Sequence, residues 1–330
     1  MSLDWKASRS VGLQGTFTVP GDKSISHRAI MLAALAEGES RIEGFLEGED
    51  TRATAKIFSQ LGVRIETPDA HTRIVHGVGL HGLKASAEAL DCGNAGTGMR
   101  LLTGLLSAQA FDSVLVGDAS LSKRPMARVI RLLEAMGAHI DARDGNFAPL
   151  RIHGGRVLQG QSVDTQVASA QVKSALIFAA LYAEGETVIT EPRPTRDYTE
   201  SMLKALGWPI TFEPGRVALC GGGRLHAVNF RIPGDISSAA FLIAAALLIP
   251  ESDITLRNIG INPRRIGVLQ AELAQIRATL AEGGHLSGKR AELAKLAAYE
   301  QEIAEYQATI SECRKQFHAQ VAKRWTAAEI

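Results

Sequence analysis

The sequence predicts an α/β protein built from repeated units, and three observations support this fold class. A run with helical spacing recurs about every 70 residues, at residues 26–35, 97–106, 169–181 and 237–248. A strand-like run follows each of them, at residues 40–44, 113–116, 187–190 and 253–256. In the first three units an arginine then heads a second helix, namely Arg52, Arg124 and Arg196. Features that recur in one order favour internal duplication over chance similarity.

The fourth unit starts like the others and then departs from them. Arg264 and Arg265 stand where a second helix should begin, but no Leu-Gly or Met-Gly pair closes that helix. Residues 289–330 contain no Gly or Pro, and their apolar residues recur every three or four positions. This pattern predicts an amphipathic helix that forms a hairpin or coiled coil. We expect residues 289–330 to mediate self-association or to bind a protein partner.

Two Pro-Gly-Asp segments, at residues 20–22 and 233–235, each precede a helix. We interpret them as the two places where the chain crosses between lobes. The predicted domains are a complete first lobe of three units at 19–231, part of a second lobe at 1–18 plus 232–269, and an unrelated helical tail at 270–330.

Composition excludes several classes of function. The net charge of +1 creates no global field that would attract nucleic acid or an anionic membrane. Three widely spaced cysteines argue against a disulfide framework or a zinc site, and the longest apolar stretch, 239–250, is too short to span a bilayer. No signal-peptide pattern opens the sequence. We therefore expect a cytoplasmic protein that binds neither nucleic acid nor membrane.

The first predicted helix starts with a dense polar cluster. Lys23 and Arg28 bracket Ser24 and Ser26 at a helix start, where free backbone N–H groups and the helix dipole favour anions. A serine-capped helix with solvated charges is the alternative interpretation. His27 lies in the same cluster, and a core or capping role for it is favoured over a catalytic one.

Later units place similar groups at their own helix starts. The second unit offers Asn94 and Gly96, and the third offers Ser169 and Gln171. If the units pack around a pseudo-symmetry axis, these helix starts converge with the arginines at 124 and 196 on one face. That face suits ligands that carry several negative charges. For either arginine alone, a surface salt bridge is the alternative.

As a set, these motifs resemble a known family. PGDKSISHRA, GNAGTGMR, KRP, SAQVKSA, TRDYTE, PGDISSAAF and INPRRIGV are similar, in order and spacing, to motifs of the 5-enolpyruvylshikimate-3-phosphate synthase family, over about residues 13–269. The resemblance implies transfer of the enolpyruvyl group of phosphoenolpyruvate to the 5-hydroxyl of shikimate 3-phosphate, with no metal or organic cofactor. It also implies an inverse α/β barrel lobe of three βαβαββ repeats that faces a second lobe of the same kind.

The resemblance also implies roles for individual residues. Shikimate 3-phosphate would be held by Lys23, Ser24, Arg28, Ser169, Gln171 and Arg196. Phosphoenolpyruvate would be held by Lys23, Asn94, Gly96, Arg124 and Gln171. Ala170 stands where many relatives have a second serine, so one hydrogen bond would be missing. The family's acid and base residues belong to the second lobe, and no match to them is found in residues 270–330.

Four interpretations follow from this partial resemblance. The first is an enzyme of this family that is truncated and weak or inactive alone. The second is a catalytically dead module that binds shikimate 3-phosphate or uses its helical tail for interactions. The third is the product of a fused reading frame. The fourth is the related transferase that acts on UDP-N-acetylglucosamine and uses a loop cysteine, although Cys92 is not in a comparable motif.

Overall fold

The computed structural model describes residues 12–249 and 251–266. The chain divides into two compact units, Met1–Ile266 and Gly267–Ile330. The predicted helical tail, with its proposed role in self-association, therefore lies outside the described residues. Within the described ranges, no helix is both long and apolar enough to cross a membrane.

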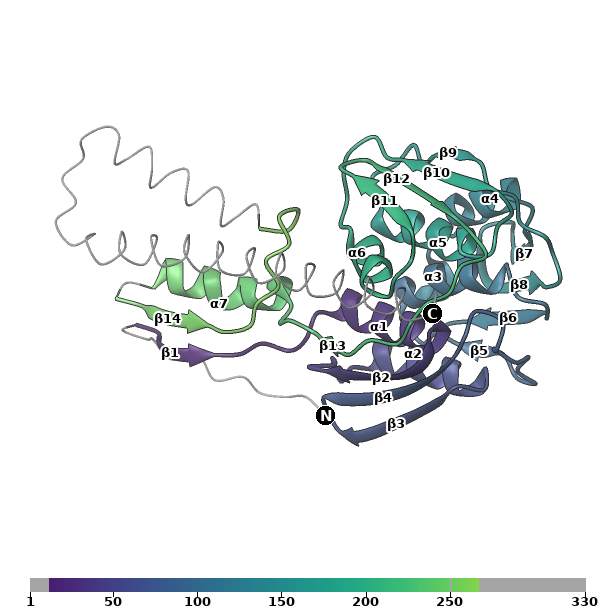
Figure 1. Cartoon of the computed structure of the whole chain (residues 1–330). Coiled ribbons are helices and arrows are strands. Elements are labelled where there is room, and N and C mark those ends of the chain that lie inside the picture. The colour runs from purple at the N-terminus through teal and green to yellow at the C-terminus, as the bar shows by residue number, and fades with distance from the viewer. Residues whose placement is uncertain (1–11, 250, 267–330) are drawn as a thin grey trace, which may run out of the picture. The chain divides into compact units, whose positions relative to one another are not determined.

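Three four-stranded sheets share one strand order, and each belongs to one repeated unit (Figure 1). The order is β13-β2-β4-β3 in the first sheet, β5-β6-β8-β7 in the second and β9-β10-β12-β11 in the third. In each sheet the first two strands are parallel, and the remaining pairs are antiparallel. The first unit comprises α1 (Lys23–Leu35), β2 (Glu37–Glu43), α2 (Glu49–Gln60), β3 (Arg64–Asp69) and β4 (Thr72–Val78).

The second and third units repeat this sequence of elements. The second comprises β5 (Leu90–Asp91), α3 (Gly96–Leu106), β6 (Ser113–Val116), the 3-10 turn η1 (Leu121–Lys123), α4 (Ala127–Ala135), β7 (His139–Arg143) and β8 (Phe147–His153). The third comprises β9 (Ser162–Asp164), α5 (Ala170–Ala180), β10 (Glu186–Thr190), α6 (Tyr198–Ala205), β11 (Ile210–Glu213) and β12 (Arg216–Cys220). The next strand, β13 (Phe230–Arg231), pairs with β2, so the end of the third unit returns to the sheet of the first.

The helices are of two kinds. α1, α3 and α5 are buried along almost their whole lengths, so they lie in the core and need no polar face. α2, α4 and α6 bury one face and expose the other. α3 and α5 pack so closely that a Cβ atom on Gly104 would lie 2.0 Å from the carbonyl oxygen of Ala175. Only glycine permits this approach between the last turn of α3 and the middle of α5.

The two Pro-Gly-Asp segments pair with each other. Gly21 and Gly234 form an antiparallel bridge, flanked by hydrogen bonds from Asp22 N to Pro233 O (2.8 Å) and from Asp235 N to Pro20 O (2.9 Å). Beyond this bridge, β1 (Gln14–Phe17) pairs in parallel with β14 (Asp253–Leu256), next to α7 (Ile236–Leu248). The residues before and after the three units thus join in one small sheet. The predicted lobe boundaries remain a prediction.

The elements expected from the sequence lie close to those observed. The four first helices correspond to α1, α3, α5 and α7, and the four strands to β2, β6, β10 and β14. One difference concerns the arginines of the second helices. Arg124 and Arg196 precede α4 and α6, whereas Arg52 lies inside α2, where its 59% exposed side chain pairs with Glu47 at 3.4 Å. Arg52 is therefore a surface salt-bridge residue.

Candidate anion-binding site

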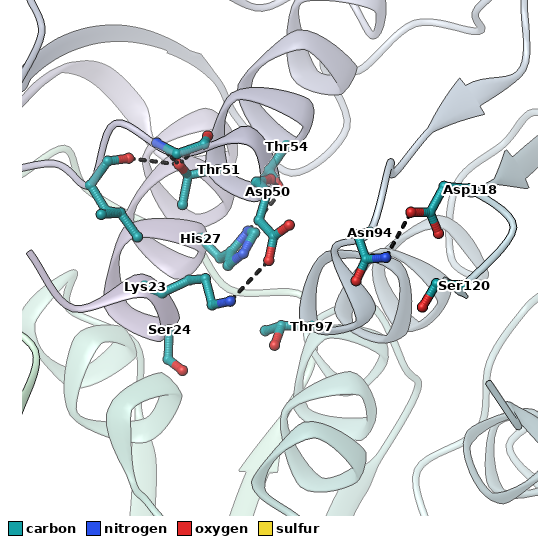
Figure 2. A network of polar contacts seen from close by, with 12 residues as sticks. Lys23, Ser24, His27, Asp50, Thr51, Thr54, Asn94, Thr97, Asp118 and Ser120 are labelled. Atoms are coloured by element: carbon teal, nitrogen blue, oxygen red, sulfur yellow. Dashed lines mark hydrogen bonds and ion pairs between the residues drawn. The ribbon is translucent and has the colours of Figure 1, made fainter. Parts of the chain in front are cut away.

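The start of α1 presents Lys23 and Ser24. The Asp22 side chain caps this helix, because its Oδ1 accepts a hydrogen bond from Ile25 N at 2.9 Å. Lys23 is the first helical residue, and its Nζ lies 3.0 Å from Asp50 Oδ2 at the start of α2 (Figure 2). With 51% of its side chain exposed, Lys23 remains accessible to a ligand. Ser24 Oγ accepts a hydrogen bond from Arg196 Nη1 of the third unit at 3.3 Å.

Arg28 is buried one turn further along α1. Its Nε donates to Thr199 Oγ1 at 2.7 Å, its Nη2 to Ser174 Oγ at 2.8 Å, and its Nη1 to Ser24 O at 2.9 Å. Burial lowers the pKa of the Arg28 guanidinium to about 10, so it stays charged at neutral pH. Arg28 thus ties α1 to α5 and α6 and holds the backbone beside Ser24.

The start of α3 carries the second group of predicted residues. Asn94 Oδ1 accepts a hydrogen bond from Arg124, and Asn94 Nδ2 donates to Asp118 Oδ2 at 2.7 Å (Figure 2). Gly96 is the first residue of α3, and a Cβ atom there would lie 3.1 Å from Arg124 Nη1 and 3.2 Å from Arg100 Nη1. The absence of a side chain at Gly96 therefore lets two guanidinium groups lie against the helix start.

The start of α5 links the second and third units. Ser169 caps this helix, and its Oγ accepts a hydrogen bond from Val172 N at 3.4 Å. Gln171 Oε1 accepts a hydrogen bond from Arg100 Nη1 at 2.8 Å, and Gln171 Nε2 donates to Thr97 Oγ1 at 2.9 Å. The amide group of Gln171 is therefore held in one orientation by two groups of α3.

A pocket of about 630 Å³ opens beside these residues. Ser169, Gln171 and Arg196 line it from the repeated units, and Arg264 and Arg265 line it from the segment after β14. The sequence indicated these last two arginines only as a mark of the fourth repeat. Arg264 donates a hydrogen bond to Thr195 O, beside Arg196. Three arginines around one polar pocket make it a candidate site for an anion.

Arg265 also joins the two Pro-Gly-Asp segments. Its guanidinium lies 3.6 Å from Asp22 Oδ2 and 3.6 Å from Asp235 Oδ1. Burial raises the pKa of Asp22, and the nearby Asp235 carboxylate raises it further, while Arg265 opposes both effects. Arg265 therefore neutralises two neighbouring carboxylates at the crossing between the segments.

A buried ion cluster lies behind Arg196, and it was not predicted from the sequence. Lys173 Nζ is 2.8 Å from Glu191 Oε2 and 2.8 Å from Glu200 Oε1, and all three side chains are at most 2% exposed. Glu191 also accepts hydrogen bonds from the backbone and hydroxyl of Thr195. Burial raises the pKa of Glu200, and the Lys173 ammonium partly offsets this rise. The cluster anchors the turn that carries Arg196.

His27 has no route to a ligand. Its side chain is fully buried, and its Nδ1 lies 2.8 Å from Thr54 Oγ1. Burial lowers the pKa of His27 to about 3, so the imidazole is neutral at physiological pH. These observations agree with the core role that the sequence favoured.

The geometry defines the class of protein as an α/β protein of three repeated units, in which arginines and hydrogen-bond donors gather at the helix starts. Comparisons with known proteins then identify the family. The family model for EPSP synthase (3-phosphoshikimate 1-carboxyvinyltransferase) matches residues 8–309. A 3-phosphoshikimate 1-carboxyvinyltransferase of Xanthomonas campestris pv. campestris (strain B100) is 62% identical over 281 residues, and one of Xanthomonas euvesicatoria pv. vesicatoria (strain 85-10) is 60% identical.

Solved structures agree with these relatives. A structure of EPSP synthase from Acinetobacter baumannii is 53% identical and superposes with a TM-score of 0.75, over 78% of this chain and 58% of that one. The chain belongs to the EPSP synthase family. The Xanthomonas alignments cover 85% of this chain but only 64% of each relative. The family match to residues 8–309 is wider than the 13–269 range of recognisable motifs.

Proposed function

We propose that this chain binds shikimate 3-phosphate and phosphoenolpyruvate and contributes their binding site to enolpyruvyl transfer. One observation carries the proposal, namely that direct side-chain contacts join helix starts that belong to different repeated units. Arg196 reaches Ser24 across the first and third units, and Gln171 reaches Arg100 and Thr97 across the second and third. The result is a continuous surface of cations and hydrogen-bond donors.

The predicted roles fit this surface. Arg196, Ser24 and Ser169 offer a charged donor and two hydroxyls to the anionic groups of shikimate 3-phosphate. The guanidinium of Arg124, beside the open backbone of Gly96, offers a second anion site for phosphoenolpyruvate. Lys23 lies at the start of α1 with its amino group exposed, and we assign it contacts with both substrates. We assign Arg28 mainly to holding Ser24 in place.

The reaction also requires proton transfers. The substrate hydroxyl loses a proton as its oxygen attacks the substituted carbon of phosphoenolpyruvate, and the methylene carbon gains one. Loss of phosphate and of a methyl proton then restores the double bond. The chain spans 64% of the length of its relatives. We assign these proton transfers to the part of the relatives that this chain does not cover. The described residues supply the cationic environment that stabilises the phosphate as it leaves.

We further propose that residues 19–231 form the inverse α/β barrel lobe of this family. The shared strand order of the three sheets supports this assignment. The face of α7 supports the presence of a second lobe next to it, because Phe241 and Leu248 are each 81% exposed.

The transferase acting on UDP-N-acetylglucosamine is a weaker candidate. Its mechanism needs a cysteine on an accessible loop. Cys92 is 1% exposed, and burial raises the pKa of its thiol. The thiol therefore has neither the accessibility nor the acidity for a catalytic acid at this position.

Calorimetric titration of the full chain with shikimate 3-phosphate tests the binding proposal. Arg196→Ala removes a charged donor from the pocket, and a lost charged hydrogen bond typically weakens binding roughly 10- to 100-fold. Arg52→Ala is the matched control, because Arg52 holds the corresponding sequence position of the first unit but lies inside α2 and pairs on the surface with Glu47. We expect the control to bind like the original chain. Equal affinities for all three proteins would contradict the proposal.

A phosphate-release assay with both substrates separates an enzyme from a binding module. Turnover that disappears in Lys23→Ala supports a catalytically competent chain. Binding without phosphate release supports the module that binds shikimate 3-phosphate alone.

A further inference from the structure

A cluster of metal-binding side chains lies on the hairpin of β7 and β8. His139 and His153 are direct cross-strand partners, and Asp141 follows two residues after His139 on the same face of β7. Their ligand atoms all lie within 4.8 Å of one another. The Asp141 carboxylate faces the Nε2 atoms of both rings, with one oxygen 2.8 Å from His153 Nε2 and the other 3.7 Å from His139 Nε2. The rings stack with their centroids 4.3 Å apart.

These distances suit a small divalent cation. Bonds of about 2.0–2.1 Å from imidazole nitrogen and carboxylate oxygen place neighbouring ligands roughly 3.4 Å apart around tetrahedral zinc. The two observed separations, 2.8 and 3.7 Å, bracket that value. His139 and Asp141 are more than half exposed and His153 is 27% exposed, so a cation can reach the cluster and the side chains can adjust.

Asp112 stands in the position of an outer-shell partner. One of its oxygens lies 3.9 Å from His153 Nδ1, and the other accepts a hydrogen bond from Gly154 N at 3.0 Å. A carboxylate beside one ring nitrogen favours the proton on that nitrogen and leaves the other free for a metal. Without a metal, His153 Nε2 is within hydrogen-bond distance of Asp141, at 2.8 Å. A metal that replaces the proton on Nε2 leaves the ring proton on Nδ1, on the side of Asp112.

The positive charges of two nearby arginines disfavour a cation at this cluster. Arg156 Nη2 lies 3.3 Å from His139 Nδ1, and Arg151 is the cross-strand partner of Asp141. Both side chains belong to exposed residues, so they can turn into solvent when a metal binds. Arg156 must do so, because a metal on His139 Nε2 places the ring proton on Nδ1.

The equivalent hairpin of the first unit, formed by β3 and β4, has an arginine where the hairpin of β7 and β8 has a histidine. There Arg64 is the cross-strand partner of His76, and Arg64 lies 2.8 Å from Glu66, which also contacts His76 Nε2 at 2.8 Å. Arg64 thus supplies a permanent positive charge beside the carboxylate. In the second unit His139 takes the register position of Arg64, so an imidazole, which can bind a metal, stands in place of the guanidinium.

We propose that His139, Asp141 and His153 form a binding site for a zinc-type divalent cation, with Asp112 orienting His153 and water completing the coordination. The sequence did not reveal this site, because its two histidines stand 14 residues apart and meet only through strand pairing. The site uses none of the residues assigned to substrate binding. It therefore stands or fails independently of the proposed transferase function.

Calorimetric titration of the full chain with zinc chloride tests the site. We expect His139→Ala to abolish one binding event, and Asp112→Asn, which keeps the acceptor for Gly154 N, to weaken that event by about tenfold or more. His76→Gln is the matched control, because His76 is a cross-strand histidine beside carboxylates but lacks a second histidine. We expect it to bind zinc like the original chain.

Thermal unfolding gives a second measurement. Zinc raises the melting temperature of a protein that binds it only when folded. We expect this rise for the original chain and for His76→Gln, and a smaller rise for His139→Ala. The site is wrong if His139→Ala keeps the zinc affinity and stoichiometry of the original chain. The role of Asp112 is wrong if Asp112→Asn binds zinc as tightly as the original chain does.

Discussion

Replacement of Lys173 by methionine tests the buried ion cluster behind Arg196. Methionine has similar length and packs well in a core, so the substitution removes the charge with little change in volume. It leaves Glu191 and Glu200 buried without their shared cation. Glu191 keeps its hydrogen bonds from Thr195, whereas Glu200 Oε2 has no hydrogen-bond partner even with Lys173 present. Glu200 is therefore the carboxyl that we expect to take up a proton.

The expected loss of stability follows from these contacts. At an effective dielectric constant of about 20, two unit charges at the observed 2.8 Å attract by roughly 6 kcal/mol. Desolvation of the buried charges offsets much of this attraction, and removal of one partner of a buried pair typically costs about 3–5 kcal/mol. We expect Lys173→Met to lower the free energy of unfolding by an amount in that range at neutral pH.

The loss also depends on pH. Burial raises the pKa of Glu200 above its ordinary value of 4.5, and loss of Lys173 raises it further. A carboxyl whose pKa is higher in the folded state stabilises the fold below its unfolded pKa and loses that contribution as pH rises through the folded pKa. The difference between Lys173→Met and the original chain is therefore smallest in acid and grows as the pH rises above the ordinary pKa of a glutamate.

Urea unfolding at several pH values measures this difference. Lys204→Met on α6 is the control, because Lys204 is exposed, and we expect it to change stability by about 0.5 kcal/mol or less. The double variant Lys173→Met with Glu200→Gln should recover part of the loss, because one buried charge is gone. A cost for Lys173→Met below about 1 kcal/mol, or a cost that does not vary with pH, would refute the reasoning.

Two further predictions concern the core helices. The pKa of His27 is lowered from 6.5 to about 3, so the free energy of unfolding falls as the pH drops through that window. Between pH 6.5 and pH 5 we expect the free energy of unfolding to fall by roughly 2 kcal/mol. His27→Gln should remove that part of the pH dependence in urea unfolding. Gly104→Ala should cost about 3 kcal/mol or more in thermal or urea unfolding, because its Cβ would lie 2.0 Å from Ala175 O, a backbone atom. Gly145→Ala, with φ of 67° but open space, should cost only about 1–2 kcal/mol, so equal losses at both positions would contradict the packing argument.

Much of the fold was predictable because each unit carries its own local signals. The spacing of apolar residues located α1, α3, α5 and α7 to within a few residues, and short β-branched runs located the strands that follow them. Such signals depend on which faces are buried, and burial imposes the same periodicity in every repeat. The arginines were harder to interpret, because one sequence position in the repeat led to three different environments.

Those environments show why the site was only partly predictable. Arg196 reaches Ser24 of the first unit, Arg124 lies over Gly96 of its own unit, and Arg52 pairs on the surface with Glu47. Each environment depends on which residues the tertiary structure packs against the arginine, from its own unit or from another. Arg264 and Arg265 line the pocket for the same reason, since the paired Pro-Gly-Asp segments bring the chain after β14 back beside Arg196.

The sequence by itself determined the repeat, the family and the residues at the helix starts, because these depend on order along the chain. Tertiary structure alone decided which of those residues meet. It placed Gln171 against Arg100, buried Lys173 with two glutamates, and brought His139 to His153. The physical reason is that charge pairing and ligand geometry act over a few ångströms in space, and packing of the units sets those distances between residues far apart in sequence.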